Sequence, residues 1–167
     1  MPVTITALDT IQLRIPLDMW AEPPLFAGRP RTHVEAVYVR VTTDKGVTGW
    51  GECNGFSGAA AVAAVEIVSR LAIGQDPADP ELTSRIQRLL HGLGRAGVLM
   101  HAISGLDIAL WDIRGKLDGV SVSKLLGGPK RKRVETYASL IQYAGNVENV
   151  KRITARAGAR LQAHQAA

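Results

Sequence analysis

Cysteine is almost absent from this 167-residue sequence, in which Cys53 is the single example. One cysteine excludes an internal disulfide and a zinc site built from several thiolates. The four histidines, His33, His91, His101 and His164, never stand four residues apart as a helical metal-binding pair does. We therefore predict no metal site in the chain, and a lone reduced cysteine favours a cytoplasmic protein.

Long apolar runs are also missing. The segment from Met1 to Pro16 alternates apolar and polar residues, unlike a signal peptide, and nothing approaches the roughly 18 apolar residues of a membrane span. Hydrophobic residues nevertheless make up 46% of the chain, enough for one compact domain with a core. The sequence therefore predicts a soluble globular protein.

Alternating patterns predict an antiparallel sheet near the N-terminus. From Val3 to Ile15 the apolar Ile11, Leu13 and Ile15 share one face, which is typical of a half-buried strand. Prolines and a glycine crowd residues 16–30, so a long loop is expected there. Two further alternating runs, 37–42 and 47–52, flank Asp-Lys-Gly and predict a hairpin. The apolar face of these three strands needs a covering layer of helices.

Helical periodicity dominates the next part of the sequence. Apolar residues recur three and four positions apart in 59–72, in 80–90 and most strongly in 98–117. A short helical turn around Leu125 and Leu126 precedes Gly-Gly-Pro, which indicates a domain boundary at 127–129. Val134 to Ile141 then has an extended pattern, and Asn146 is placed to cap a following helix. A strand followed by a helix is the unit of a parallel β/α fold.

The segment from Ala102 to Gly127, AISGLDIALWDIRGKLDGVSVSKLLG, is similar to the helix-plus-turn motif of the mandelate racemase/muconate lactonizing enzyme family of the enolase superfamily. The resemblance implies an α+β fold: an enolase-superfamily N-terminal-like capping domain of a three-stranded antiparallel sheet plus a helical layer, over residues 1–127. Residues 128–167 then correspond to the first β/α unit of an incomplete β/α barrel. Family enzymes remove the proton α to a carboxylate and stabilise the enolate with Mg²⁺.

The same resemblance implies that the catalytic groups lie outside this sequence. The family carries a Lys-x-Lys pair, acidic metal ligands and further acid/base groups on its barrel strands, whereas a barrel takes roughly 200 residues or more and only 40 follow Gly127. No Lys-x-Lys occurs in residues 158–167. We therefore expect a truncated chain without catalytic residues, without bound magnesium and inactive alone, whether the parent reaction is racemisation, dehydration or cycloisomerisation.

Two loops correspond by position to the family's substrate-covering loops, Leu17–Thr32 and Gly51–Gly58. They contain the side chains that we predict to bind a small carboxylate substrate if a barrel is present: Trp20, Phe26, Asn54 and Phe56. An exposed tryptophan in a loop favours a buried partner surface. The alternative is that these side chains serve only local packing.

Other chemistry-bearing residues have simpler interpretations. Asp107 and Asp112 stand about 140° apart on a helix and do not converge; Asp112 with Lys116 is an i,i+4 ion pair, and Asp107 is expected to accept local hydrogen bonds. Cys53 beside Glu52 lacks a basic neighbour in sequence, so a structural role is favoured over a reactive thiol.

A non-enzymatic role is the competing hypothesis. The basic run Lys130 to Arg133 contributes to a net charge of +5, but without aromatic stacking residues we predict solvated charges rather than nucleic-acid binding. The strand predicted at 134–141 lacks a neighbour in this chain and is a candidate for pairing with another subunit. A homo-oligomeric interaction module is therefore the alternative to a truncated enzyme.

Overall fold

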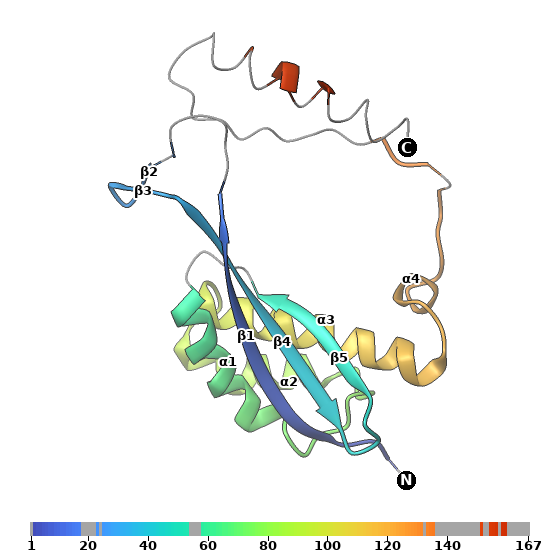
Figure 1. The fold of residues 1–167 in the computed structure, drawn as a ribbon. Coiled ribbons are helices and arrows are strands. Elements are labelled where there is room, and N and C mark those ends of the chain that lie inside the picture. Colours follow the sequence, from blue (N-terminus) through green and yellow to red (C-terminus); the bar gives the residue numbers. More distant parts are fainter. Residues whose placement is uncertain are drawn as a thin grey trace. The chain divides into compact units, whose positions relative to one another are not determined.

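In a computed structural model, the chain forms two compact units (Figure 1). The first consists of Met1–Ile15 and Glu35–Lys132, and the second of Pro16–Val34 and Arg133–Ala167. Within these units the structure describes residues 2–17, 23, 25–53, 58–131, 133–135, 151, 154–156 and 158–159.

A three-stranded sheet in the order β1-β4-β5 forms one layer. Its strands are β1 (Ile5–Pro16), β4 (His33–Thr43) and β5 (Thr48–Cys53). β4 and β5 pair antiparallel with Val37 opposite Cys53 and Thr42 opposite Thr48. The connecting turn places Gly46 at φ 73°, a conformation that glycine adopts without a steric penalty. The predicted hairpin is therefore confirmed.

Helices form the second layer and cover one face of the sheet (Figure 1). They are α1 (Gly58–Ala72), α2 (Leu82–Leu89) and α3 (Val98–Asp118), as the periodicity predicts, with the short η2 (His91–Leu93) after α2. α3 ends because Gly119 adopts the left-handed conformation and its N–H bonds back to Gly115 and Lys116. α4 (Val122–Leu125) is the predicted helical turn, and Ser121 caps it.

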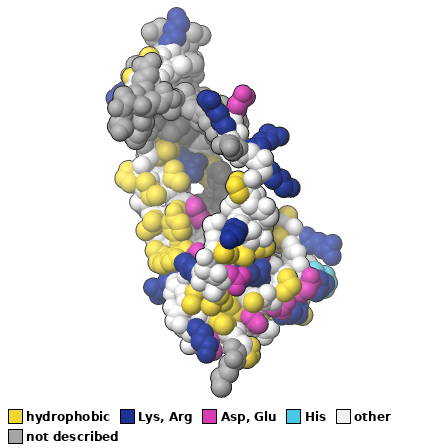
Figure 2. Space-filling view, turned by 90° about the vertical axis from the view of Figure 1, so that its right-hand side faces the viewer, with side chains coloured by type: hydrophobic (Ala, Val, Ile, Leu, Met, Phe, Trp, Pro, Cys, Tyr) yellow, Lys and Arg dark blue, Asp and Glu magenta, His cyan; other side chains and the backbone are white. Residues whose placement is uncertain are grey.

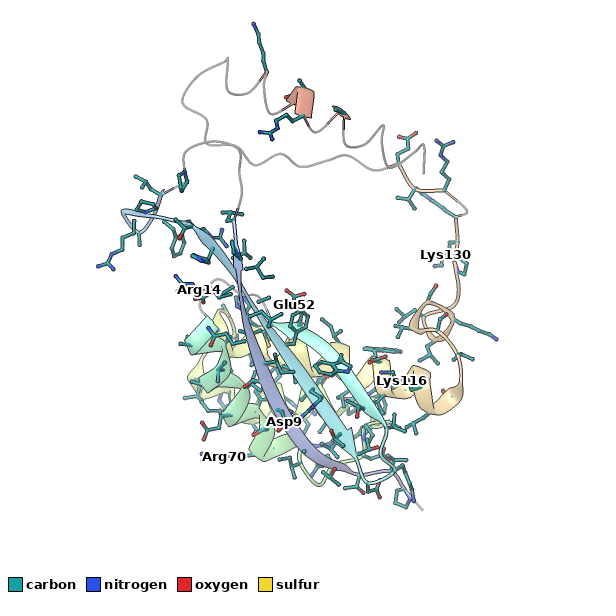
Figure 3. The ribbon with its side chains drawn as sticks, viewed as in Figure 1. Asp9, Arg14, Glu52, Arg70, Lys116 and Lys130 are labelled. Atoms are coloured by element: carbon teal, nitrogen blue, oxygen red, sulfur yellow. The ribbon has the colours of Figure 1, made fainter. Side chains whose placement is uncertain are left out.

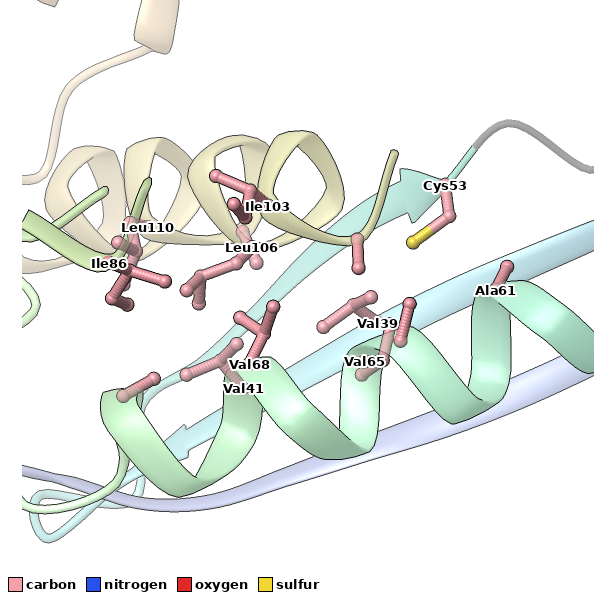
Figure 4. Packing of buried hydrophobic residues seen from close by; sticks show 14 of the residues in the cluster. Val39, Val41, Cys53, Ala61, Val65, Val68, Ile86, Ile103, Leu106 and Leu110 are labelled. Carbon is pink, nitrogen blue, oxygen red and sulfur yellow. The ribbon is translucent and has the colours of Figure 1, made fainter. Parts of the chain in front are cut away.

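The core lies between these two layers (Figure 4). Val37, Val39 and Val41 of β4 are completely buried against the helices. The helical side of the core is made of apolar residues at three- and four-residue spacing, which are Ala61, Ala64, Val65 and Val68 of α1, Leu82 and Ile86 of α2, and Leu99, Ala102, Ile103, Leu106, Ala109, Leu110 and Ile113 of α3. The stripe read from the sequence of α3 therefore faces the sheet.

The contact between β5 and α3 is closer than ordinary side-chain packing. A Cβ atom at Gly51 would overlap the carbonyl oxygen of Gly105, and one at Gly49 would overlap the carbonyl oxygen of Ala109. The reverse holds for Gly105, whose Cβ would overlap the sulfur of Cys53. Strand and helix backbones therefore meet directly, and glycine is required on both sides of the contact.

The structure corrects the assignment of the faces of β1. Leu8, Thr10 and Gln12 turn toward α1, whereas Ile11, Leu13 and Ile15 lie on the opposite face and are 36%, 42% and 48% exposed. The alternation identified two faces correctly, but it did not tell which face the helices cover. Small residues of α1 pack beside the more polar face, so the helical layer leaves the apolar one open.

The second unit corrects the long loop expected over residues 16–30. β2 (Leu25–Phe26) and β3 (Arg29–Pro30) form a small antiparallel hairpin, with Leu25 opposite Pro30 and Phe26 opposite Arg29. Ala27 and Gly28 both have positive φ, 50° and 75°, which is the geometry of a tight two-residue hairpin turn. Proline is tolerated because it sits at the end of so short a ladder.

The C-terminal expectations fall largely outside the described residues. Val134 and Glu135 are described and form no strand, and the rest of the predicted strand to Ile141, with the cap at Asn146, lies outside them. Beyond it, the described residues 151, 154–156 and 158–159 are helical. Among the described helices, none is both long and apolar enough to cross a membrane.

Replacing Gly51 with alanine tests the β5–α3 contact. Because the new methyl group meets a helix carbonyl that cannot rotate away, we expect the free energy of unfolding to fall by about 3 kcal/mol. Urea denaturation measures it. Gly92→Ala is the matched control, because nothing lies within 4 Å of a Cβ there, and its effect should stay within about 1 kcal/mol. Equal effects of the two substitutions would contradict the packing described.

Candidate functional site

The candidate site is the end of the sheet where β5 stops at Cys53 and α1 begins at Gly58. In Figure 3, Glu52 and Arg14 lie at this end. The Gly58 N–H donates to the Glu35 carboxylate of β4 over 2.8 Å, which fastens the start of α1 to the central strand. The Gln12 side chain of β1 packs at the same point, where a Cβ on Gly58 would overlap its amide nitrogen. The end of the segment 54–57 at Gly58 is thereby fixed.

Sequence reasoning missed Glu35 and Gln12. Glu35 lies 23 positions before its partner, and nothing in its neighbourhood distinguishes it from other half-buried carboxylates of a strand. The glycine at position 58 is the one usable signal, since a residue without a side chain at a helix start permits this close approach. The pairing itself is a tertiary contact that no local pattern encodes.

Cys53 is completely buried at the end of β5, where its sulfur lies against Gly105. Burial, and secondly the negative charge of Glu52, raises the pKa of the thiol to about 11. A nucleophilic cysteine needs a lowered pKa and access to a substrate. The surroundings therefore agree with the structural role expected from the sequence.

The carboxylates of α3 do not converge. Asp107 accepts a hydrogen bond from the Thr83 hydroxyl of α2 over 3.2 Å, so it links two helices instead of making the local bond expected from the sequence. Asp112 pairs with Lys116 at 2.7 Å, as its i,i+4 spacing predicts. The Trp111 ring packs under the Arg114 guanidinium, whose carbon lies 5.0 Å from the ring centre, consistent with a packing role.

The Asp112–Lys116 pair has a second role that the sequence did not predict. Asp112 also accepts the Trp50 N–H over 2.9 Å, and the Lys116 ammonium donates to the Thr48 carbonyl over 2.7 Å. These backbone groups belong to β5, an edge strand of the sheet. Side chains of α3 thus satisfy hydrogen-bonding groups that an added strand would otherwise use.

The described residues do not fit a magnesium ion. Mg²⁺ needs carboxylate oxygens gathered at one point, and no three His, Cys, Asp or Glu residues come together in the described part of the chain. Asp9 pairs with Arg40 at 2.9 Å, and Asp79 pairs with Arg85 at 2.8 Å. Backbone and side-chain hydrogen bonds lower the pKa of Asp79. These carboxylates serve the fold.

Of the four residues predicted to bind substrate, the structure describes Phe26. It lies on β2 with its side chain 55% exposed. Trp20, Asn54 and Phe56 lie outside the described residues, so the convergence of the four on one substrate stays a prediction. The basic run is exposed at Lys130, Arg131 and Arg133, and Lys132 also lies outside the described residues.

Comparison with known proteins gives a consistent result. The family model for the mandelate racemase / muconate lactonizing enzyme, N-terminal domain, matches residues 10–127. D-galactarolactone cycloisomerase of Agrobacterium fabrum is 40% identical over 147 residues, which are 87% of this chain and 38% of that protein. D-galactonate dehydratase of Ralstonia pickettii is 47% identical over 109 residues, 61% of this chain and 27% of that protein.

Solved structures agree with the sequence relatives. The structure of an enolase from Bradyrhizobium complexed with magnesium and mandelic acid superposes with a TM-score of 0.65 and 30% identity, over 78% of this chain and 36% of that one. The sheet and helical layer described above are thus those of an enolase-superfamily capping domain. The chain spans between about a quarter and two fifths of the length of these relatives.

The Cys53 thiol should be almost inert in the folded protein. With a pKa of about 11, about one molecule in a thousand carries a thiolate at pH 8. We expect iodoacetamide to label the native chain at least about 100-fold more slowly than the urea-unfolded chain, whose thiol has a pKa of about 8.5. Mass spectrometry of timed samples measures both rates, and comparable rates would contradict the burial.

The free energy of unfolding should depend on whether the Cys53 thiol is protonated. The pKa of the Cys53 thiol is higher in the folded chain than in the unfolded chain. The protonated thiol therefore contributes fully to the free energy of unfolding below about pH 8.5, and this contribution is lost as the pH rises toward 11. Cys53→Ala removes this group and provides the control: its urea midpoint should fall less steeply over that range. An identical alkaline loss in the variant would assign the effect to other groups.

Proposed function

Because the chain belongs to the mandelate racemase/muconate lactonizing enzyme family, we propose that it is the capping part of an enzyme acting on the carbon next to the carboxylate of a sugar acid. The observation that carries the proposal is the family match over residues 10–127, together with the two-layer fold of the first unit. In this role the chain binds and encloses substrate and leaves the proton transfers to a barrel.

The substrate class follows from the relatives. One is a cycloisomerase of D-galactarolactone and the other a dehydratase of D-galactonate, so both act on six-carbon sugar acids or their lactones. We propose such an acid or lactone as the substrate here. The shared chemistry is loss of a proton from the carbon next to the carboxyl group, a weak acid whose anion needs strong electrostatic stabilisation.

The described side chains support a capping role better than a catalytic one. Cys53 is buried with a raised pKa, and the carboxylates of α3 are engaged in structural contacts. A base or nucleophile must reach the substrate with a pKa near the working pH. We propose that the chain alone is inactive and that Trp20, Phe26, Asn54 and Phe56 contact the substrate when a barrel is present.

The fixed ends of the segment 54–57 fit the same role. A loop that covers a substrate needs firm anchors, because the residues it carries must return to one position at each closure. Glu35 and Gln12 hold the start of α1, and the β5–α3 contact holds Cys53. A second proposed role is association between copies of the chain, and it depends on the edge of β1.

A chimeric enzyme tests the capping role. Residues 1–127 of this chain replace the corresponding part of the Agrobacterium fabrum cycloisomerase, and kcat/KM is measured on D-galactarolactone. We expect activity within about 100-fold of the parent, since orienting contacts of a lid contribute effects of this size. In the chimera, Phe26→Ala should lower kcat/KM about tenfold through lost substrate contact.

Leu89→Ala is the matched control for that chimera. Leu89 lies on α2 and is exposed to a similar degree, 63% against 55% for Phe26, but it is on no substrate-covering loop. Its kcat/KM should equal that of the unsubstituted chimera. A folded chimera without activity would argue against the capping role, and equal losses in the two variants would argue against the assignment of Phe26.

Magnesium binding tests the proposed division of labour. The 167-residue chain should give no saturable heat on titration with MgCl₂ in isothermal calorimetry, because its described carboxylates are dispersed among structural contacts. EDTA-treated chimera should bind the ion and lose it again on chelation. A stoichiometric micromolar site in the 167-residue chain would refute the proposal that metal-dependent chemistry belongs to the barrel.

A further inference from the structure

The two edges of the three-stranded sheet differ. On β5, Asp112 and Lys116 occupy the Trp50 N–H and the Thr48 carbonyl, as described above. On β1, the corresponding protection in the described part of the chain is limited to one end, where Ile5 exchanges hydrogen bonds with Gln75 and Gly74. The edge of β1 beyond Ile5 therefore offers backbone groups on which another strand can pair.

The same strand exposes apolar side chains. On the outer face of the sheet, Arg40 reaches Asp9 at 2.9 Å and lies 6.0 Å from the centre of the Trp50 ring, so it covers the middle of that face. Ile11, Leu13 and Ile15 continue along β1 without such a cover. Figure 2 shows exposed hydrophobic side chains gathered along one side of the body. An apolar row beside an unprotected edge is typical of an interface.

We propose that β1 of a second copy of this chain pairs antiparallel with β1, around a two-fold axis through Gln12. The β1 surface, defined here as residues 9–15 with Glu66 of α1, is then complementary to itself. Around this axis Ile11 faces Leu13 of the other copy on the outer side, so these two apolar side chains cover each other, whereas Ile15 stands opposite Asp9. The two sheets join into one of six strands.

Charge selects this register. On the helical side of β1, the axis through Gln12 places Arg14 of one copy opposite Thr10 of the other. Thr10 lines a surface hollow with Leu8, Val62 and Glu66. The Arg14 guanidinium of the other copy therefore lies beside the Glu66 carboxylate, which in the single chain contacts Arg70 of its own helix. An axis through Ile11 or Leu13 would place Arg14 opposite Leu8 or Gln12 and away from that carboxylate. Each copy contributes one such contact, so the pair forms twice.

The test of this association requires neither enzymatic activity nor the strand predicted at 134–141. Sedimentation velocity on the 167-residue chain tests it directly. The wild-type chain should be largely dimeric at about 100 µM, a concentration at which a modest interface associates. Leu13→Asp should weaken the dimer at least about 100-fold, because two buried leucines are replaced by charges. Circular dichroism checks that the variant remains folded.

Leu89→Asp is the matched control, since it adds the same charge to an exposed leucine on α2. It should leave the dimer unchanged. A monomeric wild-type chain at about 100 µM, or equal weakening by the two substitutions, would overturn the proposal. Arg14→Glu should also weaken the dimer about tenfold, and Arg14→Glu with Glu66→Arg should recover most of the loss. Failure to recover would refute the proposed charge pair.

A cysteine on the axis tests the register. Gln12→Cys places two thiols opposite each other, within the Cα separation that a disulfide requires. Mild oxidation should therefore convert most of the variant to a covalent dimer on non-reducing gels, whereas Thr10→Cys, which faces Arg14, should cross-link poorly. The native Cys53 is buried and does not interfere. Preferential cross-linking of Thr10→Cys, or of neither variant, would overturn the register.

Discussion

Direct backbone contact between β5 and α3 sets the geometry of the first unit. Gly49 and Gly51 let the strand approach Ala109 and Gly105 until side chains no longer separate the two elements. The approach brings the side chains of α3 level with the strand edge, where Asp112 and Lys116 reach backbone groups of β5. A strand held further away would lose both the packing and the edge protection. One steric constraint thus determines the layer spacing and the closed edge.

The candidate site depends on the β5–α3 contact at the end of β5. Because β5 is fixed to α3, its last residue, Cys53, is fixed as well, with the sulfur against Gly105. Glu35 then holds Gly58 at the start of α1. The segment between them begins and ends on rigid elements, which is the arrangement that a substrate-covering loop needs. The fold explains the anchors of the loop, whereas the proposed chemistry depends on groups that the described residues lack.

Sequence patterns predicted the elements well and their tertiary use less well. The stripe on α3, the other helices and the 37–52 hairpin follow from periodicity and turn residues, and the motif at 102–127 identified the family. The alternation in β1 could not show that α1 covers the polar face, because period-2 patterns define two faces without ranking them. The Ala27–Gly28 turn was not predicted, because the surrounding prolines indicated an irregular loop. The Glu35–Gly58 contact was not predicted, because its residues are distant in sequence.

Self-association through β1 is compatible with a capping role. Antiparallel strands related by an axis at Gln12 run in opposite directions, so Pro16 at the end of each β1 lies on opposite sides of the axis. Eight residues separate the two ends along the paired ladder, or about 27 Å at 3.4 Å per residue. The chain segments that follow Pro16 in the two copies therefore start at opposite ends of the shared ladder, where each Pro16 stands opposite Leu8 of the other copy. The two loops thus do not compete for the same place along the paired strands.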